Sequence, residues 1–360
     1  MNQILLWLRA HRRGVAALAA GLAALGIFVL ARRDRAAMDW WLSHISMPIK
    51  RGVSFLVDPL PCSACELGAT VLIVAALVLL MRAVRRRRFA SWVLHMAVLL
   101  VWGYAAVCGL WGTQYYGTTF AEKAGMTAPP VSVEELAAVT DYFAARVNET
   151  APLVDRDANG LFAVDKREIL DGCTGLYDPL TERWPFLSGP ERRPKPALYS
   201  KLMSAWGFTG YLCPLVGEST LNVDSPAVFL PVTVAHELAH QRGVAAEQEA
   251  NFVGVMAATA SPKADYAYSG WLFGYLHLSN ALYAADPALA AESYQTLCEG
   301  ARTDLADNNA YWKQWEGPVK ETGEKVYTTF LQGYGQSLGM RSYGACVDLL
   351  VQEFFAQYKH

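Results

Sequence analysis

The chain has 360 residues, of which 53% are hydrophobic and 18% are charged, and its formal net charge is -2. A soluble domain usually carries about a quarter charged residues, so this composition predicts that part of the chain lies in a lipid bilayer. The near-neutral charge, with no basic face outside the flanks of the apolar runs, excludes a nucleic-acid partner.

Three long apolar runs occupy the N-terminal third of the chain, at about residues 14–31, 63–82 and 91–112. A helix needs about 20 apolar residues to cross the hydrocarbon core, so each run predicts a membrane-spanning helix. The first run ends in Arg-Arg-Asp-Arg rather than in a small-residue cleavage site, which favours a retained span over a signal peptide. Residues 1–112 are therefore predicted to form a multi-pass anchor in the cell membrane.

The charges on the short loops predict the orientation of this anchor. The loop between the second and third runs carries Arg82 and Arg85–Arg88, and such loops stay in the cytoplasm. Residues 113–360 then form an extracytoplasmic domain. The loop after the first run is also basic, which weakens this argument, and residues 38–45 within it have the amphipathic pattern of a segment on the membrane surface.

Residues 113–360 have a mainly helical pattern with a small β-element before residue 231. Expected strands cover 219–223 and 227–230, and expected helices cover 132–147, 197–206, 231–242, 246–260, 265–285, 287–300, 323–338 and 343–358. Four cysteines of this domain could pair outside the cytosol, but the sequence does not say how: Cys173, Cys213, Cys298 and Cys346. Cys62 and Cys65 form an isolated Cys-x-x-Cys, a weak signal for metal binding or redox chemistry.

The motif His236-Glu237-Leu238-Ala239-His240 carries the chemistry of this sequence. On a helix, side chains four residues apart leave the same face, so both imidazoles can bind one Zn²⁺. Glu237 lies beside them and can take a proton from zinc-bound water, which then attacks a carbonyl group. Pro231 suits the first turn of such a helix, and Gly243 can end it in a left-handed turn.

A third protein ligand is expected shortly after the second histidine, and two acids qualify, Glu247 and Glu249. Zinc ligands usually accept or donate a hydrogen bond beyond the metal. Four residues after Glu247 the same helical face carries Asn251, whereas Glu249 has Val253 at that spacing. We therefore predict Glu247 as the ligand, with Glu249 as the alternative.

His236-Glu237-x-x-His240 followed by Glu247-Gln248-Glu249-Ala250-Asn251 resembles the zinc signature of the gluzincin metallopeptidases. The arrangement of spans, His236–Gln241, Gly243 and Glu247–Phe252 more closely resembles an uncharacterised bacterial family of membrane-anchored zinc peptidases, which carries a domain-of-unknown-function label. The resemblance implies a zincin-like domain in which an edge strand within 219–230 pairs with the extended substrate, and the alternative there is a plain structural strand. Asn251 replaces the usual Asp of gluzincins, and Ala246 excludes the metzincins, which need His there.

A peptidase also needs a donor for the oxyanion of the tetrahedral intermediate. Tyr268 is our first choice because it opens an apolar helix after the second acidic helix, and Tyr266 and Tyr343 are alternatives. The leading hypothesis is a membrane-anchored, zinc-dependent peptidase with a peptide or protein substrate. The alternatives are a zinc amidase acting on cell-wall peptides and a non-catalytic, zinc-stabilised membrane sensor or assembly protein.

Overall fold

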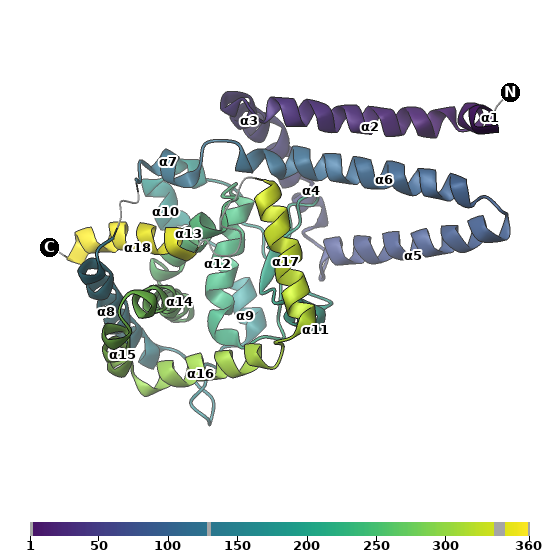
Figure 1. Ribbon diagram of the computed structural model, residues 1–360. Coiled ribbons are helices and arrows are strands. Elements are labelled where there is room, and N and C mark those ends of the chain that lie inside the picture. Colours follow the sequence, from purple (N-terminus) through teal and green to yellow (C-terminus); the bar gives the residue numbers. More distant parts are fainter. Residues whose placement is uncertain (1–2, 128–130, 335–342, 359–360) are drawn as a thin grey trace. The chain divides into compact units, whose positions relative to one another are not determined.

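The computed structural model describes residues 3–127, 131–334 and 343–358. Helices hold 73% of the residues and strands 3%, which confirms the predicted mainly helical class with a small sheet. The chain divides into two compact units. Unit 1 comprises Met1–Thr118 and Cys213–Gly217, and unit 2 comprises Thr119–Leu212 and Glu218–His360 (Figure 1).

Unit 1 contains the three apolar runs. Its helices are α1 (Gln3–Ala10), α2 (Arg12–Ala31), α3 (Arg35–Trp41), the π-helix η1 (Leu42–Ser46), α4 (Met47–Val57), α5 (Ala64–Arg85), α6 (Phe89–Leu110) and the 3-10 helix η2 (Gly112–Tyr115). Three of them, α2, α5 and α6, are long and apolar enough to cross a membrane, as predicted, and few of their residues are buried inside the protein. These exposed apolar surfaces indicate association with lipid.

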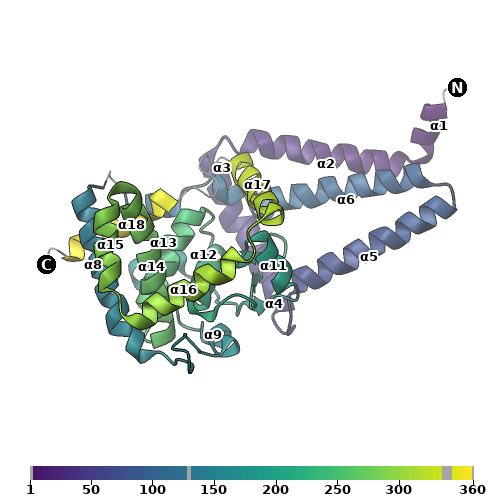
Figure 2. The same ribbon diagram turned by 60° about the horizontal axis from the view of Figure 1, so that its bottom comes forward.

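Helices α2 and α6 lie side by side and run in the same direction, as both ribbon views show (Figures 1 and 2). Near their starts, His11 Nε2 lies 2.8 Å from Ser91 Oγ. Further along, Trp102 Nε1 donates to the carbonyl of Ala17 at 3.0 Å. The N-terminal end of α2 therefore lies beside the N-terminal end of α6.

Unit 2 is built mostly of helices. They are α7 (Phe120–Ala124), α8 (Val133–Thr150), η3 (Ala151–Leu153), α9 (Lys166–Asp171), α10 (Asp178–Arg183), η4 (Pro185–Leu187), α11 (Ser200–Trp206), η5 (Ala227–Phe229), α12 (Leu230–Gln241), α13 (Glu247–Thr259), α14 (Ala264–Ala285), α15 (Pro287–Thr296), α16 (Glu299–Lys313), α17 (Pro318–Gly333) and α18 (Tyr343–Tyr358). The sequence did not predict α16 beyond residue 300, because few apolar side chains mark its inner face.

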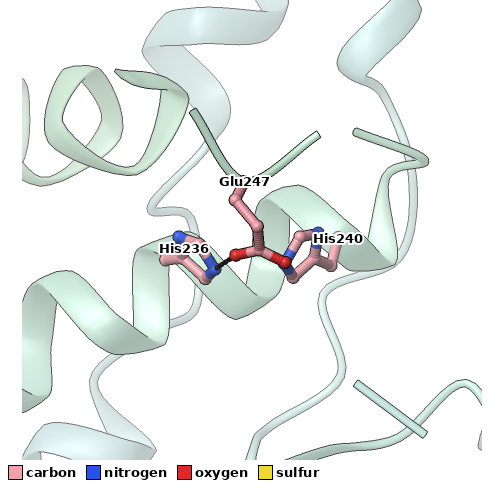
Figure 3. Close-up of side chains that lie close together, drawn as sticks. All are labelled: His236, His240 and Glu247. Atoms are coloured by element: carbon pink, nitrogen blue, oxygen red, sulfur yellow. Dashed lines mark ion pairs between the residues drawn. The ribbon is translucent and has the colours of Figure 1, made fainter. Parts of the chain in front are cut away.

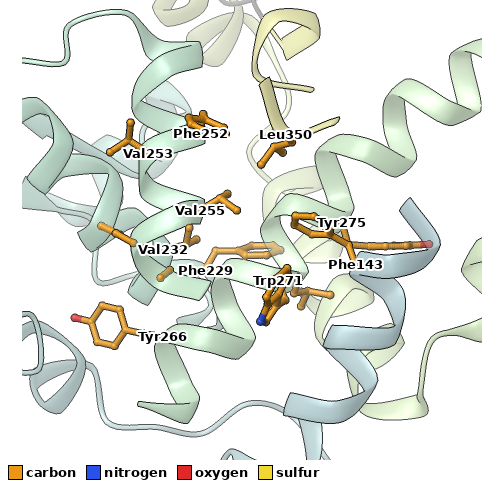
Figure 4. Close-up of a cluster of buried hydrophobic side chains, with 14 of the residues drawn as sticks. Phe143, Phe229, Val232, Phe252, Val253, Val255, Tyr266, Trp271, Tyr275 and Leu350 are labelled. Carbon is orange, nitrogen blue, oxygen red and sulfur yellow. The ribbon is translucent and has the colours of Figure 1, made fainter. Parts of the chain in front are cut away.

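The core of unit 2 surrounds α14, which packs against α8, α12, α13 and α18. Figure 4 shows the apolar side chains that these helices contribute. Gly274 of α14 lies directly under the ring of Phe143, where a Cβ atom would come within 2.3 Å of that ring. Trp271 and Phe354 pack edge-on against the same ring, so α14 is fixed tightly. The rigid core holds α12 and α13 in place.

The small sheet lies beside α12. It has strand order β1-β3-β2, with β1 (Lys195–Pro196) parallel and β2 (Gly210–Leu212) antiparallel to β3 (Ser219–Leu221). The strand predicted at 219–223 exists, but it is central and has neighbours on both sides, so an edge position there was wrong. The strand predicted at 227–230 was also wrong, because this short apolar run forms η5 and leads directly into α12.

No disulfide bond joins any two of the cysteines in the part of the chain that the structure describes. The pairing considered for the four cysteines after residue 112 is therefore absent, and Cys62 and Cys65 are not joined to each other. Three of the four, Cys173, Cys213 and Cys346, are buried as separate small apolar side chains.

Candidate metal centre

Helix α12 carries the two histidines, and its ends form as the sequence predicted. Pro231 lies in the first turn. The N–H of Val232 has no acceptor within the helix and donates instead to Ser269 Oγ of α14 at 3.2 Å. Gly243 follows the helix with φ of 90°, and the N–H of Val244 returns to the carbonyl of Ala239. This left-handed turn follows the end of α12 at Gln241, one residue after His240, and directs the chain towards α13.

Three side chains meet at one point between α12 and α13 (Figure 3). His236 and His240 point to the same side of α12, with their ring centroids 4.6 Å apart. Glu247, at the start of α13, reaches between them: its Oε2 lies 3.4 Å from His236 Nε2, and its Oε1 lies 3.7 Å from His240 Nε2. Within the described residues, these three form the one group of three or more His, Cys, Asp or Glu side chains whose donor atoms are close enough to share a metal ion.

The spacing of the three donors fits a tetrahedral metal ion. Ligand atoms about 2.0–2.2 Å from zinc, at tetrahedral angles, lie about 3.3–3.6 Å from one another. The observed separations of 3.4 and 3.7 Å between imidazole nitrogen and carboxylate oxygen are close to this range. Two imidazoles and one carboxylate also form a donor set that zinc accepts in catalytic sites.

Hydrogen bonds beyond the three donors orient two of them. His240 Nδ1 donates to the carbonyl oxygen of Val244 at 2.6 Å, which leaves Nε2 on the side of Glu247, where a metal ion would bind. Tyr327 of α17 donates its hydroxyl to Glu247 Oε1 at 2.5 Å. Among the described residues Asn251 makes no such bond, so the reason that we gave for choosing Glu247 was wrong, although Glu247 is the acid that reaches the histidines.

Glu237 lies in the same turn of α12 and is only 2% exposed. Its Oε2 has no hydrogen-bond partner among the described residues. Gly210 of β2 approaches this carboxylate so closely that a Cβ atom would lie 2.7 Å from Oε1. Burial raises the pKa of Glu237, although the charges of His240 and His236 oppose this. A buried carboxylate with one unused oxygen is ready to accept a proton from a bound molecule.

The electrostatics of the cluster favour the ionised form of Glu247 and the protonated form of His240. Burial opposes ionisation of Glu247, but the charges and hydrogen bonds of His240 and His236 hold its pKa well below the usual range. Burial likewise opposes a charge on His240, and Glu247 outweighs it, raising the pKa of His240 to about 9. An electrostatic environment that stabilises added protons also attracts a cation.

Glu249, the alternative ligand, serves another purpose. Its two carboxylate oxygens accept hydrogen bonds from the backbone N–H groups of Phe120 at 3.0 Å and Ala121 at 2.9 Å. It therefore neutralises the first turn of α7 and ties that turn to α13. The ring of Phe120 also contacts Phe252 of α13, which strengthens this connection.

The structure does not bring Tyr268 to the cluster. This tyrosine is completely buried, and its hydroxyl donates to Asp304 Oδ2 of α16 at 2.5 Å. Tyr266 is equally buried and donates to the carbonyl of Ile169 at 2.6 Å. The side chain of Tyr343 lies outside the described residues. The prediction of Tyr268 was wrong because its partner Asp304 lies on α16, a helix that the sequence pattern does not predict.

Three residues at the site were missed by the sequence analysis. Tyr327 lies 80 residues after Glu247, and Gly210 lies 27 residues before Glu237. Gly254 of α13 allows that helix to approach the backbone of His236, where a Cβ atom would lie 3.0 Å from its nitrogen. No local pattern marks these positions, because each acts through a contact that only the folded chain creates.

Comparison with known proteins places this chain in one family. No curated protein matches the chain, and no solved structure matches it. A model of a family described as "Protein of unknown function (DUF3810)" matches residues 43–351, which include the last two apolar helices, the three donors and Glu237. The chain therefore belongs to the DUF3810 family of proteins of unknown function.

Proposed function

We propose that this protein is a membrane-anchored zinc peptidase. One observation carries the proposal: the donor atoms of His236, His240 and Glu247 converge at distances that suit zinc, beside a buried Glu237 carboxylate with an unused oxygen. A purely structural zinc site usually has four protein ligands, whereas a catalytic site has three and leaves one position for water or substrate. Three donors within the described residues therefore favour catalysis.

In this proposal, different residues of the chain bind the metal and transfer the proton during hydrolysis. Zinc held by His236, His240 and Glu247 would supply a Lewis acid that makes water more acidic and polarises the carbonyl under attack. Glu237 accepts the proton of the attacking water at Oε2 and returns it to the nitrogen of the leaving group. The raised pKa of Glu237, which its burial causes, suits a group that must both take up and release a proton near neutral pH.

The position of β2 favours a peptide as the substrate. β2 is an edge strand of the described sheet, and Gly210 in it lies against Glu237. An extended peptide that adds to such an edge is held by backbone hydrogen bonds, which recognise any peptide main chain. The missing side chain at Gly210 lets the strand run beside the carboxylate that acts on the scissile bond. The edge strand implied by the family resemblance thus corresponds to β2 and not to 219–230.

The charges at the ends of the spans support an extracytoplasmic location for unit 2. Because α2 and α6 run in parallel, Arg12 and Arg13 lie at the same end of unit 1 as Arg85–Arg88. Concentrated positive charge stays in the cytoplasm. α6 then leads outward, and the chain enters unit 2 on the outer side. This location keeps a cell-wall peptide amidase as the second candidate, since it would use the same residues.

The test is zinc content and peptide hydrolysis of the purified full-length protein in detergent, compared with the Glu237→Gln variant. We expect one equivalent of zinc in both proteins, and a hydrolysis rate about 10²–10⁴-fold lower in the variant, because the proton acceptor is lost while the donors remain. Glu182→Gln, at an exposed position of α10, is the matched control and should retain full activity. A casein digest and a set of cell-wall peptides separate the peptidase from the amidase.

Two results would contradict the proposal. Protein without stoichiometric zinc after loading would remove the metal centre. Zinc in both proteins with no hydrolysis of any substrate would leave a structural metal in a sensor or assembly protein. Removal of zinc with a chelator should abolish hydrolysis, and added zinc should restore it.

A further inference from the structure

Residues 35–57 of unit 1 form a continuous helical segment with an unusual distribution of side chains. It comprises α3, η1 and α4, and the residues at both junctions have helical backbone angles. Its buried residues are Met38, Leu42, Ser46, Met47, Lys50 and Ser54, most of them four residues apart. Three of these six residues are polar, so the inner face of segment 35–57 is more polar than is usual for a helix on a water-soluble protein.

The outer surface of the segment is apolar along one side. Trp41, Ile49 and Leu56 recur at spacings of eight and seven residues and are 38%, 45% and 75% exposed. Phe55 is exposed beside Leu56. Exposed aliphatic and aromatic side chains above a polar inner face are expected when the surrounding medium is lipid rather than water.

Hydrogen bonds fix the segment at one end of the span α6. Trp41 Nε1 donates to the carbonyl of Gly109 at 2.8 Å, and Ser46 Oγ donates to the same carbonyl at 2.6 Å. Gly109 lies in the last turn of α6, which begins at Phe89, directly after Arg85–Arg88. At 1.5 Å per residue, the two ends of α6 are about 30 Å apart, which equals the thickness of the hydrocarbon core. The segment is therefore held at the level where the opposite leaflet meets water.

The connections of the segment keep it there. Three residues, 32–34, join it to α2, and six residues, 58–63, join it to α5. Even fully extended, these linkers span only about 10 and 20 Å. The segment therefore begins and ends close to the ends of two helices whose apolar sides are also exposed. Its apolar side continues the surface that these spans offer to lipid.

We propose that segment 35–57 lies in the plane of the membrane, with Trp41, Ile49, Phe55 and Leu56 inserted between the lipids of the leaflet opposite the Arg85–Arg88 loop. Lipid, and not another protein, therefore covers the apolar side of segment 35–57. The inference rests on the three spans and is independent of the metal centre, so the activity assay and the test below can fail separately.

The test uses the full chain in phosphatidylcholine–phosphatidylglycerol nanodiscs. The photoreactive residue p-benzoylphenylalanine is placed singly at Ile49 or Leu56, and mass spectrometry identifies the adducts after irradiation. Leu77, exposed in the middle of α5, is the positive control, and Ser43, exposed elsewhere on the same segment, is the matched control. We expect lipid adducts at positions 49 and 56 in yields similar to position 77 and several-fold above position 43.

Three outcomes would overturn the inference. Adducts of positions 49 and 56 with peptides of unit 2 would show that protein covers the segment. Equal lipid yields at positions 43 and 56 would show that no particular side faces the bilayer. The absence of lipid adducts at position 77 would remove the spans on which the inference rests, and hydrolysis by the purified protein would be unaffected by that result.

Discussion

The two units of this protein place the same kinds of side chain in opposite environments. In unit 2, Leu272 and Leu350 are completely buried, whereas in unit 1 Leu72 and Leu100 are 56% and 71% exposed. Polar groups are buried in both units, but differently. In unit 1 they are spaced along segment 35–57, where Ser46 bonds a neighbouring helix, whereas in unit 2 they converge on the point between α12 and α13.

This difference teaches where to look for function. Buried polar groups are costly unless they are paired, so each one in a protein needs a purpose. In unit 1, Ser46 satisfies that requirement with hydrogen bonds to a neighbouring helix. In unit 2, the donors of the cluster face one another around a point that a cation can occupy, and Glu237 Oε2 has no partner among the described residues. Convergence, and not burial alone, distinguishes a candidate site.

The largest expected effect is on zinc affinity. It appears when a histidine of the cluster in unit 2 and a histidine of α6 in unit 1 are each replaced by alanine. His240→Ala should weaken zinc binding by more than about a hundredfold, because loss of a direct ligand exceeds the 10–100-fold effect of residues beyond the ligands. His95→Ala, at an exposed position of α6, should leave zinc binding unchanged. Titration against a competing chelator measures both. Equal affinities would mean that the convergence in unit 2 does not bind metal.

The second comparison is between a leucine that is buried in the core of unit 2 and a leucine that is exposed on an apolar helix of unit 1. Leu272→Ala opens a cavity in the core of unit 2 and should lower the free energy of unfolding by about 2–5 kcal/mol. Leu72→Ala removes a side chain that is exposed on α5 and should change it by less than about 0.5 kcal/mol. Denaturant unfolding of the detergent-solubilised variants measures both values. A large loss for Leu72→Ala would show that α5 packs against protein there.

Much of this architecture could be predicted from sequence because it depends on local patterns. The three spans follow from length and apolarity, and α12 from Pro231, the histidine spacing and Gly243. The pairing of His236 with His240 is a property of one helix, and the nearness of Glu247 follows from a short turn. These contacts involve residues within about three helical turns of one another in the chain.

The rest depends on contacts between distant segments, which local patterns do not report. Tyr268 was chosen from its position in a helix, but its direction is set by Asp304, on a helix whose polar sequence gave no signal. The strand at 219–221 was recognised, yet its central position depends on β1 and β2, which are only two and three residues long. Tyr327 reached Glu247 only through the packing of α17.

A smaller effect separates the two acids of α13. Glu249→Ala should lower the free energy of unfolding by about 1–3 kcal/mol, because two backbone N–H groups of α7 lose their acceptor. It should still bind one equivalent of zinc. Glu247→Ala should differ from Glu249→Ala in losing zinc binding, whatever its effect on stability. Unfolding and zinc titration of both variants measure this difference, and loss of zinc in Glu249→Ala alone would assign the ligand to Glu249.

The smallest effect concerns Tyr327, which holds Glu247 from a third helix. Tyr327→Phe removes only the hydroxyl, so the ring still packs against Phe208 while Glu247 Oε1 loses its donor. We expect zinc affinity to fall about tenfold, at the lower end of the effect of residues that orient a metal ligand. Tyr283→Phe, at a position that is 65% exposed, is the control and should bind zinc like the wild type. Chelator competition resolves a tenfold difference, and unchanged affinity in Tyr327→Phe would mean that α12 and α13 position the three donors without help from α17.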